Sequence, residues 1–182
     1  KWDEFIETPS KKFGYQVPSF QPSVFREYRG EIFTTFHSEE HPVMRHIHYD
    51  KDEISIHGRF SRSYKGVLRG LHGDFETWKL VQCLYGSLLQ VVVDMRPDSN
   101  TFLQYDMFSI NDKNRNQILI PPGFANGHLV MSEFGIFSYK QSTLYKGAGA
   151  QFTVRWNDPK VNIAWPIDNP ILSSRDKNAE LL

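Results

Sequence analysis

The segment from Ser63 to Asp74 combines a histidine with nearby glycines and an arginine. Gly70 and Gly73 allow the backbone to approach a ligand closely, and Arg69 offers a permanently charged fork for phosphate or carboxylate. Histidine, the residue type at position 72, commonly serves as a general base. A turn that carries a surface histidine explains the same string equally well, so this segment alone leaves both interpretations open.

Residues 120–128, IPPGFANGH, have the shape of the Pro-x-Gly-x-x-His turn that supplies a metal ligand in many cupins. Asn126 stands where that histidine would be. The His-x-His pair of a metal cupin is also incomplete, because Asp74 is the second residue after His72. We therefore expect no catalytic metal and no cofactor.

Two other groups of residues give weaker evidence for a metal site or a nucleophile. His46-Ile47-His48 would place both rings on one face of a strand, but it lies in a charged stretch, which favours a solvated edge over a metal site. Cys83 is the only cysteine, so an internal disulfide and a multi-cysteine zinc site are excluded. Its neighbours are typical of a strand interior, and we interpret it as a core residue, not a nucleophile.

The segment Phe137-Ser138-Tyr139-Lys140 alternates with a period of two, which puts Phe137, Tyr139 and Gln141 on one face of a strand. The phenol of Tyr139 could thus point into a barrel, although an aromatic packed in the core with its hydroxyl paired is the better interpretation of this string alone. Near the end, residues 156–159 and 171–176 form polar clusters that ordinarily indicate Asx turns or helix caps.

Short β-rich runs closed by turn residues must position these side chains. Their spacing predicts an all-β fold, a cupin-type double-stranded β-helix or jelly roll with short peripheral helices. We expect one domain over residues 1–182, with an irregular segment over residues 1–20 that packs as an arm. The expected strands are Gly30–Phe36, Ile54–His57, Gly66–His72, Trp78–Tyr85, Ser87–Asp94, Thr101–Ile110, Gln117–Ile120, His128–Met131, Ile136–Thr143 and Gln151–Trp156.

Composition narrows the class of protein. The chain has 40% hydrophobic residues, enough for a folded core, and its 21 basic and 21 acidic side chains cancel. This balance argues against nucleic acid and anionic membranes as partners. Every apolar run is shorter than the roughly 18 residues that span a bilayer, and residues 1–4 do not resemble a signal-peptide core. We expect a cytoplasmic protein.

Taken in order, these residues resemble the dTDP-4-dehydrorhamnose 3,5-epimerase family of cupins. The resemblance runs from Arg29 to Asp176. It rests on Arg29-Gly30, Val67 to His72, Lys79-Leu80-Val81, Val91 to Arg96, Ser99 with Thr101-Phe102, Pro121 to Gly127, Tyr139-Lys140, Tyr145, Trp156-Asn157-Asp158, Trp165-Pro166, Leu172-Ser173 and Asp176.

The resemblance implies a jelly-roll homodimer with exchanged strands or arms, a nucleotide-sugar substrate, and specific roles. His72 would be the base, Asp176 the carboxylate that orients it, and Tyr139 the acid on the opposite face of the sugar. Substrate contacts would come from Arg69 and Lys79 in the pocket and from Arg29 near the nucleotide. The remaining candidates for substrate binding are Arg59, Ser61, Asn126 and His128.

Several positions depart from the pattern of the rhamnose enzymes. Thr34 replaces a base-reading glutamate, His57-Gly58-Arg59 replaces Gln-x-Asn, Gln90 replaces an aspartate, and Asn126 replaces a histidine. These substitutions resemble epimerases that act on GDP-linked 4-keto-heptoses in bacterial capsule pathways. The departures favour guanosine over thymidine as the nucleobase.

The sequence thus predicts an epimerase that inverts C3, C5 or both in a 4-keto-6-deoxy sugar linked to GDP or dTDP. Two alternatives remain. A ketoisomerase of the same family would move the carbonyl between C3 and C4 with a similar base. A cupin binding module would keep the pocket without chemistry, although the intact set of His72, Tyr139 and Asp176 argues against it.

Overall fold

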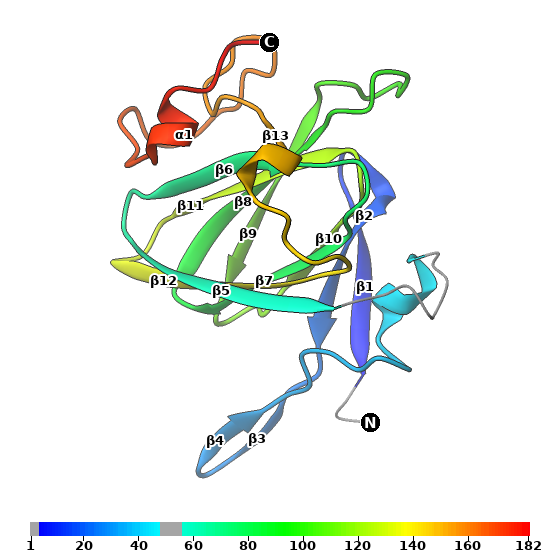
Figure 1. Ribbon diagram of the computed structural model, residues 1–182. Coiled ribbons are helices and arrows are strands. Elements are labelled where there is room, and N and C mark those ends of the chain that lie inside the picture. Colours follow the sequence, from blue (N-terminus) through cyan, green and yellow to red (C-terminus); the bar gives the residue numbers. More distant parts are fainter. Residues whose placement is uncertain (1–3, 48–55) are drawn as a thin grey trace.

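Two antiparallel β-sheets stacked on each other form the body of the protein (Figure 1). A computed structural model describes residues 4–47 and 56–182. One sheet has six strands in the order β1 (Phe5–Ser10), β2 (Gly14–Pro22), β10 (Gln117–Ile120), β7 (Lys79–Tyr85), β12 (Phe134–Gln141) and β5 (His57–Tyr64). The other has five, in the order β13 (Phe152–Thr153), β6 (Leu68–Gly73), β11 (Phe124–Val130), β8 (Ser87–Asp94) and β9 (Tyr105–Asn111).

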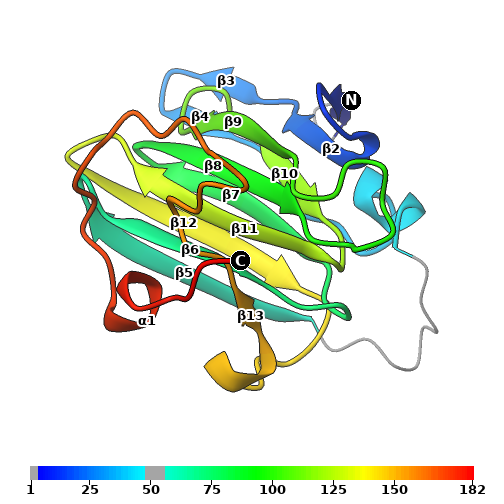
Figure 2. The same ribbon diagram turned by 90° about the horizontal axis from the view of Figure 1, so that it is seen from above.

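Helical elements are few and short, and they lie at the periphery. They are the 3₁₀ turns η1 (Pro42–Arg45) and η2 (Ala148–Ala150) and the helix α1 (Ser174–Lys177), which lies beside β6 (Figures 1 and 2). The predicted all-β jelly roll with short peripheral helices is confirmed. Among the described residues, no helix is long and apolar enough to cross a membrane.

The strands bury apolar residues on more than one face. The main core lies between the sheets and includes Val81 and Cys83 from one sheet with Val92 and Phe124 from the other. A second cluster covers the outer face of the five-stranded sheet, where Val91 and others pack against residues 152–165. Burial on both faces explains why Val91, Val92 and Val93 follow one another in β8, since a strand with one solvated face would alternate apolar and polar residues.

Cys83 is a core residue, as predicted. It is 4% exposed, and burial raises the pKa of its thiol to about 11. The thiolate that a nucleophile needs is therefore disfavoured at neutral pH.

The prediction that residues 1–20 are irregular is wrong. Residues 5–22 form the strands β1 and β2, which pair with each other, and β2 continues the large sheet through β10. Pro9, Pro18 and Pro22 concealed this hairpin, because proline lacks the backbone donor of a central strand. The structure places Pro9 at an irregularity in the β1–β2 register, between Thr8 and Ser10, where a missing donor is tolerated.

Other predicted strands differ in their bounds. Of the expected strand Gly30–Phe36, only Gly30–Ile32 is a strand, β4, and it forms a short hairpin with β3 (Phe25–Glu27). This hairpin projects from the body in Figure 1. Residues 101–103 form a turn, so β9 begins only at Tyr105. Of the expected strand Ile54–His57, residues 54 and 55 lie outside the described residues, and β5 begins at His57.

Candidate active site

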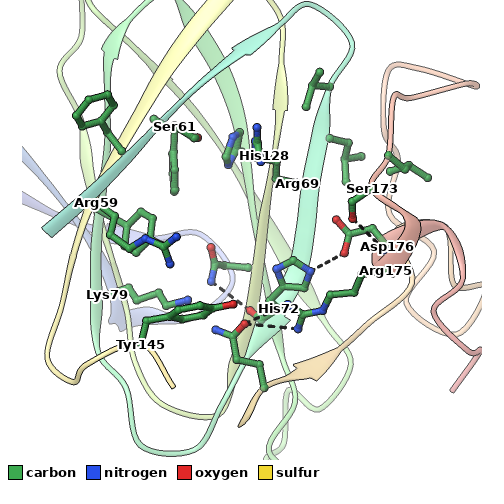
Figure 3. A pocket seen from close by; sticks show the side chains of 18 of the residues that line it. Arg59, Ser61, Arg69, His72, Lys79, His128, Tyr145, Ser173, Arg175 and Asp176 are labelled. Atoms are coloured by element: carbon green, nitrogen blue, oxygen red, sulfur yellow. Dashed lines mark hydrogen bonds and ion pairs between the residues drawn. The ribbon is translucent and has the colours of Figure 1, made fainter. Parts of the chain in front are cut away.

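A pocket of about 550 Å³ is lined by side chains from both sheets (Figure 3). Its volume suits a small ligand such as a sugar with part of its phosphate chain. Every predicted site residue except Arg29 lines it. The six-stranded sheet contributes Arg59, Phe60 and Ser61 from β5, Lys79 from β7, and Phe137 and Tyr139 from β12; the five-stranded sheet contributes Leu68, Arg69 and His72 from β6, and Asn126 and His128 from β11.

His72 and Asp176 form a hydrogen-bonded pair at one side of the pocket (Figure 3). The Nε2 of His72 lies 2.5 Å from Oδ1 of Asp176, and Oδ2 accepts a hydrogen bond from the backbone N–H of Gly70 at 3.2 Å. Burial alone would raise the pKa of the Asp176 carboxyl, but these hydrogen bonds and the nearby imidazole outweigh it and lower that pKa. An ionised Asp176 holds the proton of neutral His72 on Nε2, which leaves the lone pair on Nδ1.

Local structure explains why Asp176 faces the imidazole. Ser173 is the N-cap of α1, and its hydroxyl oxygen accepts a hydrogen bond from the backbone N–H of Asp176. This cap fixes the first turn of the helix. The cap predicted for residues 171–176 is confirmed, and Asp158 likewise forms the predicted Asx turn by accepting from the N–H of Lys160.

Tyr139 lies on the other sheet, opposite Arg59 in the register between β12 and β5. Burial raises the pKa of its phenol, while the charge and a hydrogen bond of Arg59 act in the other direction. The phenol is therefore protonated at neutral pH. The alternation predicted for residues 137–141 is confirmed, with Phe137 and Tyr139 both facing the pocket.

Lys79 completes this side of the pocket, with its Nζ 5.7 Å from the centre of the Tyr139 ring. Burial lowers the pKa of the ammonium group, and the charges of Arg175 and Arg59 add to this effect, whereas Asp74 opposes it. Figure 3 shows Arg59, Lys79 and Tyr145 together, across the pocket from Asp176. The Arg59 guanidinium stacks over the ring of Tyr145 at 4.6 Å.

The charges of the lining favour an anionic ligand. Arg59, Arg69, Lys79 and Arg175 line the pocket, and Asp176 is the only carboxylate among its described lining residues. Permanently charged guanidinium groups suit phosphate oxygens, which they bind through two parallel hydrogen bonds.

Arg29 lies outside this pocket. It is in the turn between β3 and β4, its side chain is 75% exposed, and its Nε donates to Glu27 at 2.6 Å. Within one chain the structure thus does not bring Arg29 to the other predicted residues. The first histidine of the His-x-His motif, His46, contacts Glu7 through Nε2, and His48 lies outside the described residues.

Arg175 and Gln151 are among the lining residues that were not predicted. The guanidinium of Arg175 donates to the Thr153 hydroxyl at 3.0 Å and to the Gln151 side chain at 3.4 Å, and both Arg175 and Gln151 line the pocket. The signal for Arg175 was its place next to Asp176. No pattern in the sequence marks Gln151.

The described residues provide no set of side chains that could coordinate a metal ion. Within residues 4–47 and 56–182, no three His, Cys, Asp or Glu side chains gather closely enough to hold an ion. Asn126, which stands where a cupin ligand would be, donates instead from Nδ2 to the backbone carbonyl of His72 at 3.2 Å. Metal-independent activity stays a prediction.

Comparison with known proteins gives the family. A profile described as dTDP-4-dehydrorhamnose 3,5-epimerase matches residues 15–182. The chain is 36% identical over 166 residues to dTDP-4-dehydrorhamnose 3,5-epimerase of Shigella flexneri, which covers 88% of each protein. It is 32% identical over 166 residues to the protein of that name from Methanothermobacter thermautotrophicus, covering 87% of this chain and 85% of that one.

Solved structures agree with this result. The epimerase of Legionella pneumophila in complex with dTDP-4-keto-L-rhamnose superposes with a TM-score of 0.87 at 31% identity, covering 98% of this chain and 93% of that one. A 3′-monoepimerase of Streptomyces bikiniensis in complex with dTDP-quinovose superposes with a TM-score of 0.84 at 26% identity, covering 96% and 86%. The chain therefore belongs to the dTDP-4-dehydrorhamnose 3,5-epimerase family, and it is an isomerase that epimerises a nucleotide-linked 4-keto sugar.

Proposed function

We propose that this enzyme inverts C3, C5 or both in a nucleoside-diphosphate-linked 4-keto-6-deoxy sugar by moving protons between His72 and Tyr139. One observation carries the proposal: the two side chains enter one pocket from different sheets, His72 from β6 and Tyr139 from β12. A sugar ring held between them would have a base on one face and an acid on the other. Net inversion requires such an arrangement, because a base alone returns the proton to the face it came from.

The chemistry needs no redox step. A ketone at C4 makes the C–H bonds at C3 and C5 acidic, because the carbanion is delocalised as an enolate. Nδ1 of His72 has no hydrogen-bond partner among the described residues, and it is the nitrogen that would take this proton. Asp176 would then stabilise the imidazolium through the 2.5 Å contact to Nε2.

Lys79 and Tyr139 fit the remaining roles. The cationic Nζ of Lys79 would stabilise the developing C4 oxyanion, where a pre-aimed donor contributes most. The protonated phenol of Tyr139 would deliver a proton to the enolate carbon from the other face. Arg59, Arg69 and Arg175 would hold the diphosphate, whose binding energy keeps the sugar in place for reaction.

The nucleobase of the substrate can be proposed from the sequence motifs. The relatives named above are dTDP enzymes, whereas the motifs at residues 29–34, 72–74, 90–94 and 126–128 resemble those of GDP-heptose epimerases. We favour a GDP-linked sugar, with dTDP as the alternative. We also favour a homodimer, because the projecting β3–β4 hairpin would allow Arg29 to reach the nucleotide in a partner's pocket.

A ketoisomerase is the second candidate, since it uses a similar base next to a carbonyl. The position of Tyr139 on the sheet opposite His72 favours epimerisation, because a 3,4-shift requires no acid on the opposite face. A binding module without activity is disfavoured by the His72–Asp176 pair, because a module that only binds would not need an oriented base.

The test is to incubate the purified protein in D₂O with GDP- and dTDP-linked 4-keto-6-deoxy sugars and to follow each carbon by NMR. We expect deuterium at C3, C5 or both, inverted configuration at the labelled carbon, and a ketone that remains at C4. A ketone found at C3 would establish the ketoisomerase. Absence of exchange with every substrate would contradict the proposed function.

A further inference from the structure

Gln90 and Asn126 form a hydrogen-bonded pair of amides beside the base. Asn126 of β11 is the register partner of His72 of β6, and both line the pocket, so their side chains are neighbours on its wall. Gln90 of β8 is fully buried and is not among the described residues that line the pocket. Its Nε2 donates to Oδ1 of Asn126 at 3.4 Å and to the backbone carbonyl of Val91 at 3.3 Å. Gln90 therefore acts on the pocket through Asn126.

The backbone carbonyl of His72 determines how both amides are turned. A carbonyl oxygen only accepts hydrogen bonds, so Asn126 faces it with Nδ2, at 3.2 Å. Oδ1 of Asn126 then faces Gln90 and accepts from Nε2. This leaves Oε1 of Gln90 buried and without a partner among the described residues, which costs about 1–3 kcal/mol. The orientation of Asn126 is kept although Gln90 loses a hydrogen bond, which points to a use for the Asn126 amide.

The oriented amide presents one neutral donor to the pocket. Nδ2 of Asn126 carries two N–H groups, of which one is donated to His72 and the other to no described residue. The other cross-strand neighbour of Gln90 is His128, which is 3% exposed. Burial, together with the charge of Arg69, lowers the pKa of His128 to about 3, so this ring is neutral at physiological pH. The free N–H of Asn126 therefore selects an oxygen atom that accepts a hydrogen bond.

We infer that Asn126 is a catalytic residue that donates to the C4 oxygen of the sugar, and that Gln90 is a positioning residue that orients it. The inference rests on the proposed function, in which His72 takes a proton from a carbon next to C4. Since C4 is bonded to both C3 and C5, a donor beside His72 is close to the C4 oxygen whichever of the two carbons reacts. That oxygen gains negative charge as the enolate forms.

Two donors would then meet at this oxygen. Lys79 extends into the pocket from the six-stranded sheet, and Asn126 lies on the five-stranded sheet (Figure 3). Donors that are fixed before the reaction stabilise a developing oxyanion more than they stabilise the neutral ketone. The loss of Asn126 should therefore affect kcat rather than KM. A contact with an ordinary hydroxyl group of the sugar would instead raise KM.

The first experiment measures kcat and KM for deuterium wash-in, with the substrate that the D₂O experiment identifies. Asn126→Ala should lower kcat about 10²- to 10³-fold, with KM within about threefold of the wild-type value. Asn126→Ser, which keeps a single donor, repeats the measurement if alanine prevents folding. Gln90→Met has a similar length but no donor, and it should lower kcat about tenfold because the amide of Asn126 is then held less firmly.

The double variant shows whether Gln90 acts through Asn126. In the Asn126→Ala background, Gln90→Met should change kcat by less than about twofold, because there is no amide left to orient. Gln82→Met is the matched control, since Gln82 is also a buried glutamine of a central strand and accepts from Gln117 at 3.2 Å, away from the pocket. It should leave kcat within about twofold of the wild-type value.

The second experiment observes the carbonyl group directly by infrared difference spectroscopy. The substrate carries ¹³C at C4 and is bound to His72→Asn, in which the base is absent. We expect a C4 carbonyl band at lower frequency than in free substrate, and a shift back toward the free value when Asn126→Ala is added. Gln90→Met should produce a smaller shift in the same direction.

Three results would overturn the inference. They are a higher KM with unchanged kcat in Asn126→Ala, a carbonyl band that this substitution does not move, and a Gln90→Met effect that is equal in the presence and absence of Asn126. Absence of exchange in the wild type with every substrate would instead refute the proposed function, and with it this inference.

Discussion

Replacing Asp176 by asparagine should reduce turnover about 10³- to 10⁴-fold, and the reason lies in two hydrogen bonds. Oδ1 of Asp176 faces Nε2 of His72 at 2.5 Å, and Oδ2 accepts from the N–H of Gly70 at 3.2 Å. When His72 is neutral, the two groups that face the Asp176 carboxylate, Nε2–H of His72 and the N–H of Gly70, are both hydrogen-bond donors. An amide has one acceptor oxygen and one NH₂ group, so Asp176→Asn can satisfy only one of them.

Each orientation of the amide has a predictable effect. If its oxygen faces Gly70, its NH₂ group faces His72, and the imidazole must move its proton from Nε2 to Nδ1. The lone pair that would remove the substrate proton is then lost. If its oxygen faces His72, the donors of Gly70 and the amide oppose each other, and no negative charge stabilises the imidazolium. A wrong tautomer of this kind lowers turnover by about 10⁴ in a serine protease triad, so we expect a barrier increase of about 4–5 kcal/mol.

The assay is steady-state kinetics with the substrate that the D₂O experiment identifies. Because the Asp176 side chain is 4% exposed, it should contact the substrate little, and the loss should fall on kcat with KM within about threefold. Asp158→Asn is the matched control, since that buried carboxylate also accepts two backbone hydrogen bonds, from Lys160 and Leu182, outside the pocket. A loss of less than tenfold in folded Asp176→Asn, or an equal loss in the control, would refute this reasoning.

Three further predictions concern pH, nucleotide and metal. His128 becomes protonated below pH 6.5 in the unfolded chain but only near pH 3 in the folded chain, so the folded state loses stability as the pH falls. Urea unfolding at pH 7 and pH 5 should show that the free energy of unfolding falls by about 2 kcal/mol less in His128→Phe than in the wild type. Equal decreases in the two proteins would contradict the burial argument. Calorimetric titration should find GDP bound at least tenfold more tightly than dTDP, a difference of about 1.4 kcal/mol, and the opposite order would make thymidine the base. Activity should survive chelators, with elemental analysis finding far less than one metal per chain; inactivation on removal of a stoichiometric metal would contradict this.

The sequence predicted the architecture well where turns and apolar runs are regular. The strand from Ser87 to Asp94 was predicted with its observed bounds, and that from Gln117 to Ile120 as well, because each is apolar and closed by turn residues. The hairpin of β1 and β2 was missed. Its prolines suppress the strand signal, and its pairing with β10 is a tertiary contact that no local pattern contains.

The site was predictable only in part from its own residues. His72 and Asp176 are separated by 104 positions, and their contact depends on how α1 docks beside β6. The resemblance to the family supplied that pairing, whereas the string around His72 was equally compatible with a surface turn. The hydrogen bond between Gln90 and Asn126 could not be predicted, since it depends on which buried side chains the folded barrel brings together.

The most direct test of the mechanism compares deuterium exchange with inversion in two variants. In D₂O, His72→Asn should neither exchange nor invert above the rate of buffer, because the variant lacks the imidazole that takes the first proton. Tyr139→Phe keeps the ring but loses the hydroxyl, so His72 should still form the enolate and return a deuteron to the original face. We predict that the ratio of deuterium wash-in to inverted product rises strongly in Tyr139→Phe, with thermal melts confirming folding. Exchange near the wild-type rate in His72→Asn, or inversion at the wild-type rate in Tyr139→Phe, would contradict the assignment of base and acid.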